Sequence, residues 1–184
     1  MTNSGSAPDT DAARDGDTVV ADSVTGGTYT LLVDVPTDIT VEVGALGTHG
    51  IPAGAYAYTG SALGAGGFSR VERHRRVARG DHEVRHWHID YLLGHPDTDI
   101  DHVVRSVGVD VECAVAGRLP TGPIDGFGAS DCDCESHLAA GATVEGLAAH
   151  VYETHEDAVA YRNGAKDSVT DTVDVVSGAG GTER

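Results

Sequence analysis

Arginine is concentrated in one short part of the chain. Six of the eleven arginines lie within residues 70–85, together with three acids, so this stretch carries a formal charge of +3 in a chain of −17. At helical spacing, Arg70, Arg73 and His74 share one side of a helix. Because the guanidinium group offers forked donors that match phosphate oxygens, the stretch predicts contact with a phosphate. The alternative is a solvated helix face whose arginines pair with neighbouring carboxylates.

A second group of residues could bind a metal ion. Cys132, Cys134 and His137 lie within six residues of one another, and Cys113 is the remaining cysteine. Thiolates and an imidazole are ligands of structural zinc sites. The Cys-x-Cys spacing differs from the usual Cys-x-x-Cys, so free cysteines packed beside a loop are the alternative. The odd number of cysteines argues against a disulfide framework and predicts a reduced, cytoplasmic protein.

A third group, His86, His88 and Asp90, alternates along the chain. In an extended segment the three side chains point to one side, where they could bind a metal or line a phosphate site. In a helix only His86 and Asp90 share a face, and these residues would serve as surface or capping groups at the helix start. Both interpretations remain open. The remaining histidines are expected on the surface, at positions 49, 82, 95, 102, 150 and 155.

The net charge of the chain indicates the salt concentration to which the protein is adapted, and it says less about which partner the protein binds. The chain has 29 acidic residues against 12 basic ones, and Lys166 is the single lysine. This composition predicts a protein adapted to multimolar salt, and it excludes long-range attraction of nucleic acid. At about 1 M salt the Debye length is only about 3 Å, so distant carboxylates hardly repel a phosphate held by arginines. A local phosphate site therefore remains open.

The secondary-structure elements that position these residues are short, and they include both strands and helices. Apolar patterning predicts strands at 28–35, 40–43, 54–59 and 102–107, and helices at 68–79, 87–93, 110–119 and 143–161. Asp110 is the expected N-cap of the third helix. The interval between Tyr29 and Tyr58 leaves room for an extra strand pair, and valines at 173–176 could form a short strand. Because strands and helices are partly segregated, the fold class is α+β, a small sheet with helices packed on it.

The length of 184 residues allows one ordinary domain with tails. We expect a disordered acidic tail, a folded domain, a helix that packs on the domain, and a flexible tail, at residues 1–25, 26–141, 142–163 and 164–184. The sequence has neither an apolar run of membrane-spanning length nor an evident signal peptide. No membrane association is therefore expected.

Several motifs occur in a fixed order. Gly27-Thr28-Tyr29 lies on the first expected strand and Tyr58-Thr59-Gly60 ends a later one, before the helix that carries Arg70 and His74. Further stretches are HWHIDYLL at 86–93, Glu112-Cys113-Ala114, and GFGASDCDCESHL at 126–138. Over about residues 26–140, the chain resembles the GIY-YIG (Uri) nuclease superfamily, most closely the stand-alone archaeal branch of predicted Uri endonucleases. The resemblance implies a small antiparallel sheet flanked by helices.

The resemblance also implies a divalent-metal-dependent endonuclease that hydrolyses DNA phosphodiester bonds. It gives Tyr29 a part in activating the attacking water, Arg70 the stabilisation of phosphate charge, and Glu112 the binding of Mg²⁺ or Mn²⁺. Tyr58 and His74 support them, and nucleic-acid contacts are expected from Arg73, Arg76, His86 and His88. DNA is the implied partner, and DNA-repair proteins are further candidates because members of this branch occur fused to repair glycosylases.

Three alternatives remain open at this point. Asp110 or Glu72 could replace Glu112 as the metal ligand. The chain could be a non-catalytic nucleic-acid-binding module with a structural zinc site. It could also be a metal-dependent phosphoesterase that uses His86, His88 and Asp90. The sequence does not indicate an oligomeric state.

Overall fold

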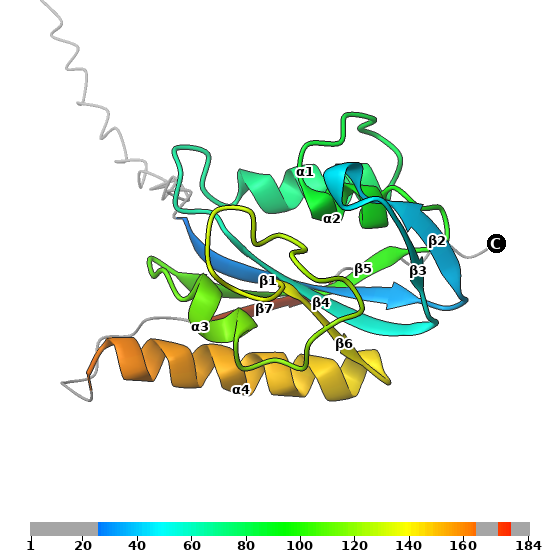
Figure 1. Ribbon diagram of the computed structural model, residues 1–184. Coiled ribbons are helices and arrows are strands. Elements are labelled where there is room, and N and C mark those ends of the chain that lie inside the picture. Colours follow the sequence, from blue (N-terminus) through cyan, green and yellow to red (C-terminus); the bar gives the residue numbers. More distant parts are fainter. Residues whose placement is uncertain (1–25, 165–172, 178–184) are drawn as a thin grey trace, which may run out of the picture.

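The structure, a computed structural model, describes residues 26–164 and 173–177. The expected disordered tail at 1–25 and most of the expected flexible tail at 164–184 lie outside these residues. Within them, a small antiparallel sheet flanked by helices confirms the predicted α+β class (Figure 1).

The sheet has five strands in the order β6-β4-β1-β5-β7, and every neighbouring pair is antiparallel. The bounds of these strands are β1 (Gly27–Val35), β4 (Gly54–Ser61), β5 (Asp99–Val107), β6 (Leu138–Gly141) and β7 (Val173–Ser177). The central strand β1 is buried along almost its whole length, and its buried threonines Thr28 and Thr30 make side-chain hydrogen bonds. The short strand expected near the C-terminus forms β7, whereas β6 was not predicted.

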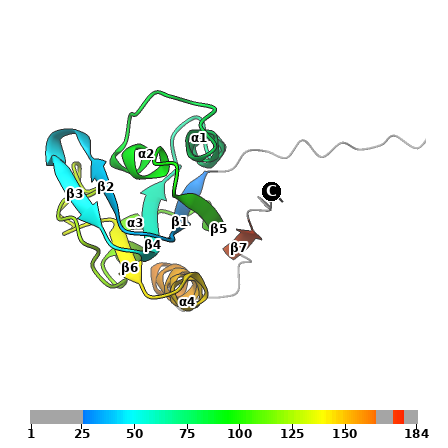
Figure 2. The same ribbon diagram turned by 90° about the vertical axis from the view of Figure 1, so that its right-hand side faces the viewer.

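Helices cover both faces of the sheet (Figure 2). On one face lie α1 (Ser69–Ala78) and α2 (His88–Leu93), and on the other lie α3 (Glu112–Ala116) and α4 (Val144–Arg162). Thr143 caps α4, since its Oγ1 accepts a hydrogen bond from the backbone N–H of Gly146 at 3.2 Å. Among the described helices, none has the length and apolar character needed to cross a membrane.

The side chains of β1 alternate between two cores. Tyr29, Leu31 and Val33 pack beneath α1 and α2, while Leu32 packs on the opposite side with residues of α3 and α4. This alternation follows from the two-residue repeat of a strand. It places Tyr29 on the face that also receives the arginine-rich helix α1.

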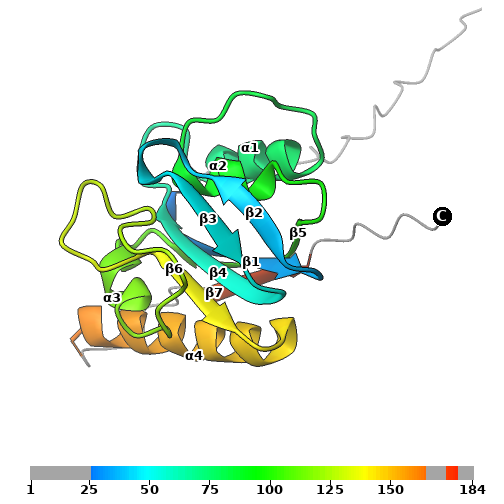
Figure 3. The same cartoon turned by 45° about the vertical axis from the view of Figure 1, so that its right-hand side comes forward.

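The extra strand pair expected between Tyr29 and Tyr58 is confirmed. β2 (Ile39–Glu42) pairs with β3 (Thr48–Ile51) around a short 3-10 turn, η1 (Gly44–Leu46). Figure 3 shows this hairpin in front of the sheet and close to α2. Its buried isoleucines and valine extend the core beneath α1 and α2.

The third helix is shorter than predicted, and its predicted N-cap was wrong. α3 spans five residues, its N-cap position is Val111, and Asp110 is exposed. Thr28 Oγ1 donates a hydrogen bond to the carbonyl oxygen of Val109 and accepts one from the N–H of Val111, at 3.1 and 2.9 Å. A hydroxyl on β1 therefore fixes the approach to α3, and the carboxylate of Asp110 is not needed there.

His155 was expected on the surface, and that prediction was wrong. It is fully buried between α4 and the sheet, where its Nε2 lies 2.8 Å from Thr30 Oγ1 and its Nδ1 lies 2.7 Å from Ser106 Oγ. Both ring nitrogens have hydroxyl partners, so a neutral imidazole can be buried without an unsatisfied group. Burial lowers the pKa of His155 to about 4.

Candidate functional site

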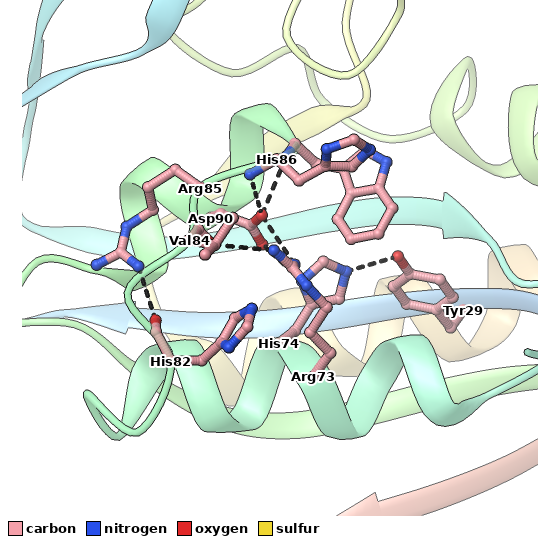
Figure 4. Close-up of polar contacts among 9 residues, drawn as sticks. Tyr29, Arg73, His74, His82, Val84, Arg85, His86 and Asp90 are labelled. Atoms are coloured by element: carbon pink, nitrogen blue, oxygen red, sulfur yellow. Dashed lines mark hydrogen bonds and ion pairs between the residues drawn. The ribbon is translucent and has the colours of Figure 1, made fainter.

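A chain of hydrogen bonds joins β1 to the two helices above it. The hydroxyl of Tyr29 lies 2.9 Å from His74 Nε2, and His74 Nδ1 lies 3.0 Å from Asp90 Oδ1 (Figure 4). An ionised carboxylate can only accept, so Nδ1 donates to Asp90 and Nε2 accepts the O–H of Tyr29. Burial lowers the pKa of His74, although the hydrogen bond and charge of Asp90 act in the opposite direction. The imidazole is therefore neutral at pH 7, with its free lone pair directed at Tyr29.

Asp90 is the polar centre of this region. Its carboxylate accepts from Nη1 of Arg73 at 2.8 and 2.9 Å, and from the backbone N–H groups of His86 and Trp87 at 2.8 and 3.0 Å. Burial alone would raise the pKa of Asp90, but the hydrogen bonds from His74, the two backbone groups and Arg73 lower it well below its usual range. Asp90 thus orients the imidazole and caps the start of α2 at the same time.

The two motif tyrosines lie together on the α1 face of the sheet. The ring centroids of Tyr29 and Tyr58 are 6.4 Å apart, and both rings contact His74. A Cβ at Gly60 would come within 2.6 Å of the Tyr29 hydroxyl oxygen, so glycine leaves room for this hydroxyl. Burial raises the pKa of both phenols, and the negative charge of Glu112 raises it further while Arg70 lowers it. A phenolate is therefore unfavourable here unless a further positive charge is added.

Arg70 and Arg73 stack on the indole of Trp87, with their guanidinium carbons 4.7 and 4.5 Å from the ring centroid. Arg70 also donates to the carbonyl oxygen of Ser61 at 2.6 Å, and Arg73 donates to that of Val84 at 2.9 Å. Much of the donor capacity of Arg73 is therefore used within the protein.

A pocket of about 320 Å³ opens beside these side chains. It is lined by Arg70, Arg73 and Arg76, which were expected to contact phosphate, by Trp87, and by the glycine-rich turn before α1. Arg76 is exposed at its edge. The pocket combines guanidinium donors with a backbone turn that lacks side chains, which is a suitable environment for an anionic oxygen.

The alternating group at the start of α2 does not form a metal site. Both oxygens of Asp90 are occupied, as described above. The ring of exposed His86 packs edge-on against Trp87 with centroids 4.5 Å apart, whereas His88 Nδ1 accepts a hydrogen bond from Gly128 N–H at 2.9 Å. Burial lowers the pKa of His88. The structure thus favours the capping interpretation over a metal site made by these three residues.

Glu112 is the first residue of α3, and its side chain is 23% exposed. Its Oε1 lies 3.3 Å from His137 Nδ1, which is an ion-pair distance. The buried Nδ1 has no hydrogen-bond partner among the described residues. Glu112 is near enough to the tyrosines for its charge to raise their pKa values, but its direct contact is with the cysteine-rich loop.

The three cysteines and His137 come together as expected. One ligand atom from each of these four side chains lies within 4.8 Å of the others, and His137 Nε2 is 3.3 Å from Cys132 Sγ. All three cysteines are free thiols. Within the part of the chain that the structure describes, these four residues form the one cluster of three or more potential metal ligands. The cluster could bind a metal such as zinc.

Sequence reasoning missed three contacts of this site: Asp90 with His74, Trp87 with the arginines, and Glu112 with His137. A signal existed for Asp90, because it lies in the first turn of the expected second helix, where a carboxylate caps backbone N–H groups; in the structure it is the third residue of α2. The other two contacts depend on how helices α1 and α3 pack against segments that follow later in the sequence, and no local pattern encodes them.

A family model matches residues 28–160, a span that includes every site residue named above. Comparisons with curated proteins and with solved structures find no match. Because the matched span is well over half of the chain, the protein belongs to the family described as a domain of unknown function, DUF123.

Proposed function

We propose that the protein is a divalent-metal-dependent endonuclease that hydrolyses DNA phosphodiester bonds, as in the GIY-YIG (Uri) superfamily that its motifs resemble. The observation that carries the proposal is the hydrogen-bonded chain Tyr29–His74–Asp90 with Arg70 close by. On the same resemblance we propose DNA repair or processing as its role, and from its free cysteines we propose a reduced, cytoplasmic location.

The direction of the hydrogen bonds supports proton transfer away from the reacting water. The Tyr29 hydroxyl oxygen keeps lone pairs for a water while its proton points to His74 Nε2. As the water attacks phosphorus, its proton passes to the Tyr29 oxygen and the phenolic proton passes to His74. The resulting imidazolium is paired with the ionised Asp90. The bond from phosphorus to the leaving oxygen breaks, and that oxygen takes up a proton as the site resets.

Arg70 provides positive charge beside this chain. Its charge lowers the pKa of both tyrosines and of His74. Its guanidinium group lines the pocket next to the turn before α1. A positioned guanidinium stabilises the charge that develops on phosphate oxygens in the transition state. Arg76, which is exposed at the pocket, suits a neighbouring phosphate of the same strand.

The donor set suits a hard divalent cation. Glu112 offers a carboxylate near two phenol oxygens, and Mg²⁺ commonly binds through one or two carboxylates together with substrate phosphates and waters. Mg²⁺ or Mn²⁺ held by Glu112 would supply Lewis-acid charge to the phosphate and offset the raised pKa of the phenols. Asp110 and Glu72 are exposed, whereas the charge of Glu112 raises the pKa of both tyrosines, so Glu112 is the preferred ligand.

The proposal is tested by incubating the full chain with Mg²⁺ or Mn²⁺ in multimolar KCl and with duplex, nicked, flapped and single-stranded DNA. We expect cleavage of at least one substrate, its loss on chelation, and its loss in Arg70→Ala. Arg118→Ala is the control, because Arg118 is exposed and its guanidinium faces the ring of Tyr161 on α4, on the opposite side of the sheet from the hydrogen-bonded chain. Absence of cleavage on all four substrates would contradict the proposal.

A second candidate is a non-catalytic nucleic-acid-binding module. The burial of both tyrosines and the cluster of potential zinc ligands favour it. It predicts that DNA binding depends on the arginine-rich helix and that no cleavage accompanies binding. Measuring binding and cleavage on the same samples separates the two candidates.

A further inference from the structure

We propose that Cys113, Cys132, Cys134 and His137 bind one Zn²⁺, and that Glu112 is the carboxylate that orients His137 in this centre. The zinc ion would then fix Glu112 beside the motif tyrosines. The zinc centre and its carboxylate partner do not depend on the endonuclease activity. The claim that zinc prepares Glu112 for catalysis does rest on the proposed function.

The distances fit tetrahedral zinc with little rearrangement. Zn–S bonds of about 2.3 Å and Zn–N bonds of about 2.0–2.1 Å place tetrahedral ligand atoms roughly 3.6–3.8 Å apart. The four atoms lie within 4.8 Å of one another, and the Cys132 Sγ–His137 Nε2 distance is 3.3 Å. Adjustments on the order of 1 Å or less would complete the geometry, and rotation about cysteine side-chain bonds can provide them.

The four ligands join two separate parts of the chain. Cys113 lies on α3, whereas the other three lie in the loop that leads into β6. The backbone of His137 fixes this loop, because its N–H donates to the carbonyl oxygen of Phe127 at 2.7 Å and its carbonyl accepts from Thr59 N–H at 3.0 Å. Thr59 follows the motif residue Tyr58 on β4. A metal in the cluster would therefore hold α3 and this loop next to the second tyrosine.

The ring of His137 has the orientation of a metal ligand with a carboxylate partner. Nε2 faces the thiol of Cys132, so when Nε2 binds zinc the proton must lie on Nδ1. Nδ1 is buried and has no hydrogen bond to the part of the chain that the structure describes, and Oε1 of Glu112 is 3.3 Å away. A small rotation of the ring on metal binding would align this N–H with the carboxylate. Carboxylates in this position fix the ring and strengthen the bond to the metal.

Gly128 connects the loop to the tyrosines. It has a positive φ of +76°, and a Cβ there would lie 2.8 Å from Tyr58 Cε2 and 3.0 Å from His137 Cβ. The loop thus passes between the ring of Tyr58 and His137 at van der Waals distance. The second carboxylate oxygen of Glu112 would serve the cleft while Oε1 contacts His137.

The decisive experiment measures zinc affinity rather than cleavage. The full chain, Glu112→Gln and Asp133→Asn are loaded with zinc, and affinity is measured by competition with a chromogenic chelator in one buffer. Asp133→Asn is the matched control, since it removes one charge from an exposed residue between two of the cysteines. We expect one zinc per chain, and roughly 10–100-fold weaker binding in Glu112→Gln than in Asp133→Asn. Less than half an equivalent of zinc in the full chain, or equal affinities in the two variants, would overturn the proposal.

Two further measurements keep the outcome clear if a variant folds poorly. Hydrogen exchange of the unmodified chain should show slower exchange of residues 112–116 and 126–137 with zinc than after its removal, and equal exchange would contradict a shared centre. Cys134→Ser removes one proposed zinc ligand and leaves the chemical groups of the cleft unchanged. If zinc prepares Glu112 for catalysis, cleavage by this variant at saturating Mg²⁺ should fall at least tenfold. Undiminished cleavage by a zinc-free chain refutes the link to catalysis. If the unmodified chain cleaves no DNA, the proposed function fails while the affinity comparison still decides the zinc centre.

Discussion

Replacement of Asp90 by asparagine is expected to destabilise the protein strongly. The carboxylate is fully buried and accepts hydrogen bonds from Arg73, His74 and two backbone N–H groups at 2.8–3.0 Å. Arg73 is only 16% exposed, so Asp90→Asn leaves a guanidinium without its counter-charge. Removal of one partner of a buried ion pair typically costs about 3–5 kcal/mol. Because the amide still offers one oxygen to these donors, we expect the lower end, about 3 kcal/mol.

Equilibrium unfolding in urea measures this loss, at constant KCl and with unchanged slope. Asp97→Asn is the control, because Asp97 is 58% exposed and lies 3.9 Å from His95, and a change within about 0.5 kcal/mol is expected. The folded-state pKa of Asp90 is lowered, so its contribution is complete above its unfolded pKa of about 3.9 and is lost only as the pH falls through the folded value. The difference from the unmodified chain should therefore be constant between pH 7 and 5. A loss no larger than that of the control, or one that disappears within this pH range, would refute the reasoning.

Three further predictions concern the Tyr29 hydroxyl, the close approach of Gly128 to Tyr58, and the buried imidazole of His155. Tyr29→Phe leaves His74 Nε2 without its donor, so urea unfolding should show a loss of about 1–3 kcal/mol. Gly128→Ala should destabilise more than Gly108→Ala in the same assay, because both have φ +76° but only at Gly128 would the Cβ meet a neighbour, Tyr58 Cε2 at 2.8 Å. His155 has its pKa lowered to about 4, so its contribution is complete above about pH 6.5 and falls away towards pH 4, by about 3 kcal/mol. His155→Gln should lack this part of the pH dependence, and parallel stability curves would exclude a buried neutral imidazole.

The long elements could be predicted from the sequence because their apolar residues follow one pattern. β1 contains the apolar run Leu31-Leu32-Val33, and α4 has Leu147, Val151 and Ala158 on one face. The same periodicity places His155 on that face, four residues after Val151, so a signal for its burial was present. β6, with the sequence LAAG, carries almost no strand preference of its own, and it exists because β4 offers a free edge for pairing.

The site could be predicted only in part. The motifs identified Tyr29, His74 and the cysteine cluster, because these residue types recur at recognisable spacing. The role of Asp90 as partner of His74 was not evident, since it depends on how α2 packs against α1. The contact between Glu112 and His137 was not evident either, because it arises from a loop that closes onto α3 without regular secondary structure. Local patterns report elements, whereas such contacts are determined by tertiary packing.

The central claim is that Tyr29 takes part in cleaving DNA. The most direct measurement compares the unmodified chain with Tyr29→Phe on one DNA substrate at saturating Mg²⁺, recording single-turnover cleavage and DNA binding on the same samples. We predict that the unmodified chain cleaves, and that Tyr29→Phe lowers the cleavage rate at least 100-fold, in line with loss of a general base worth about 10²–10⁴-fold, while it binds DNA as tightly. Equal cleavage rates in the two proteins would contradict the account.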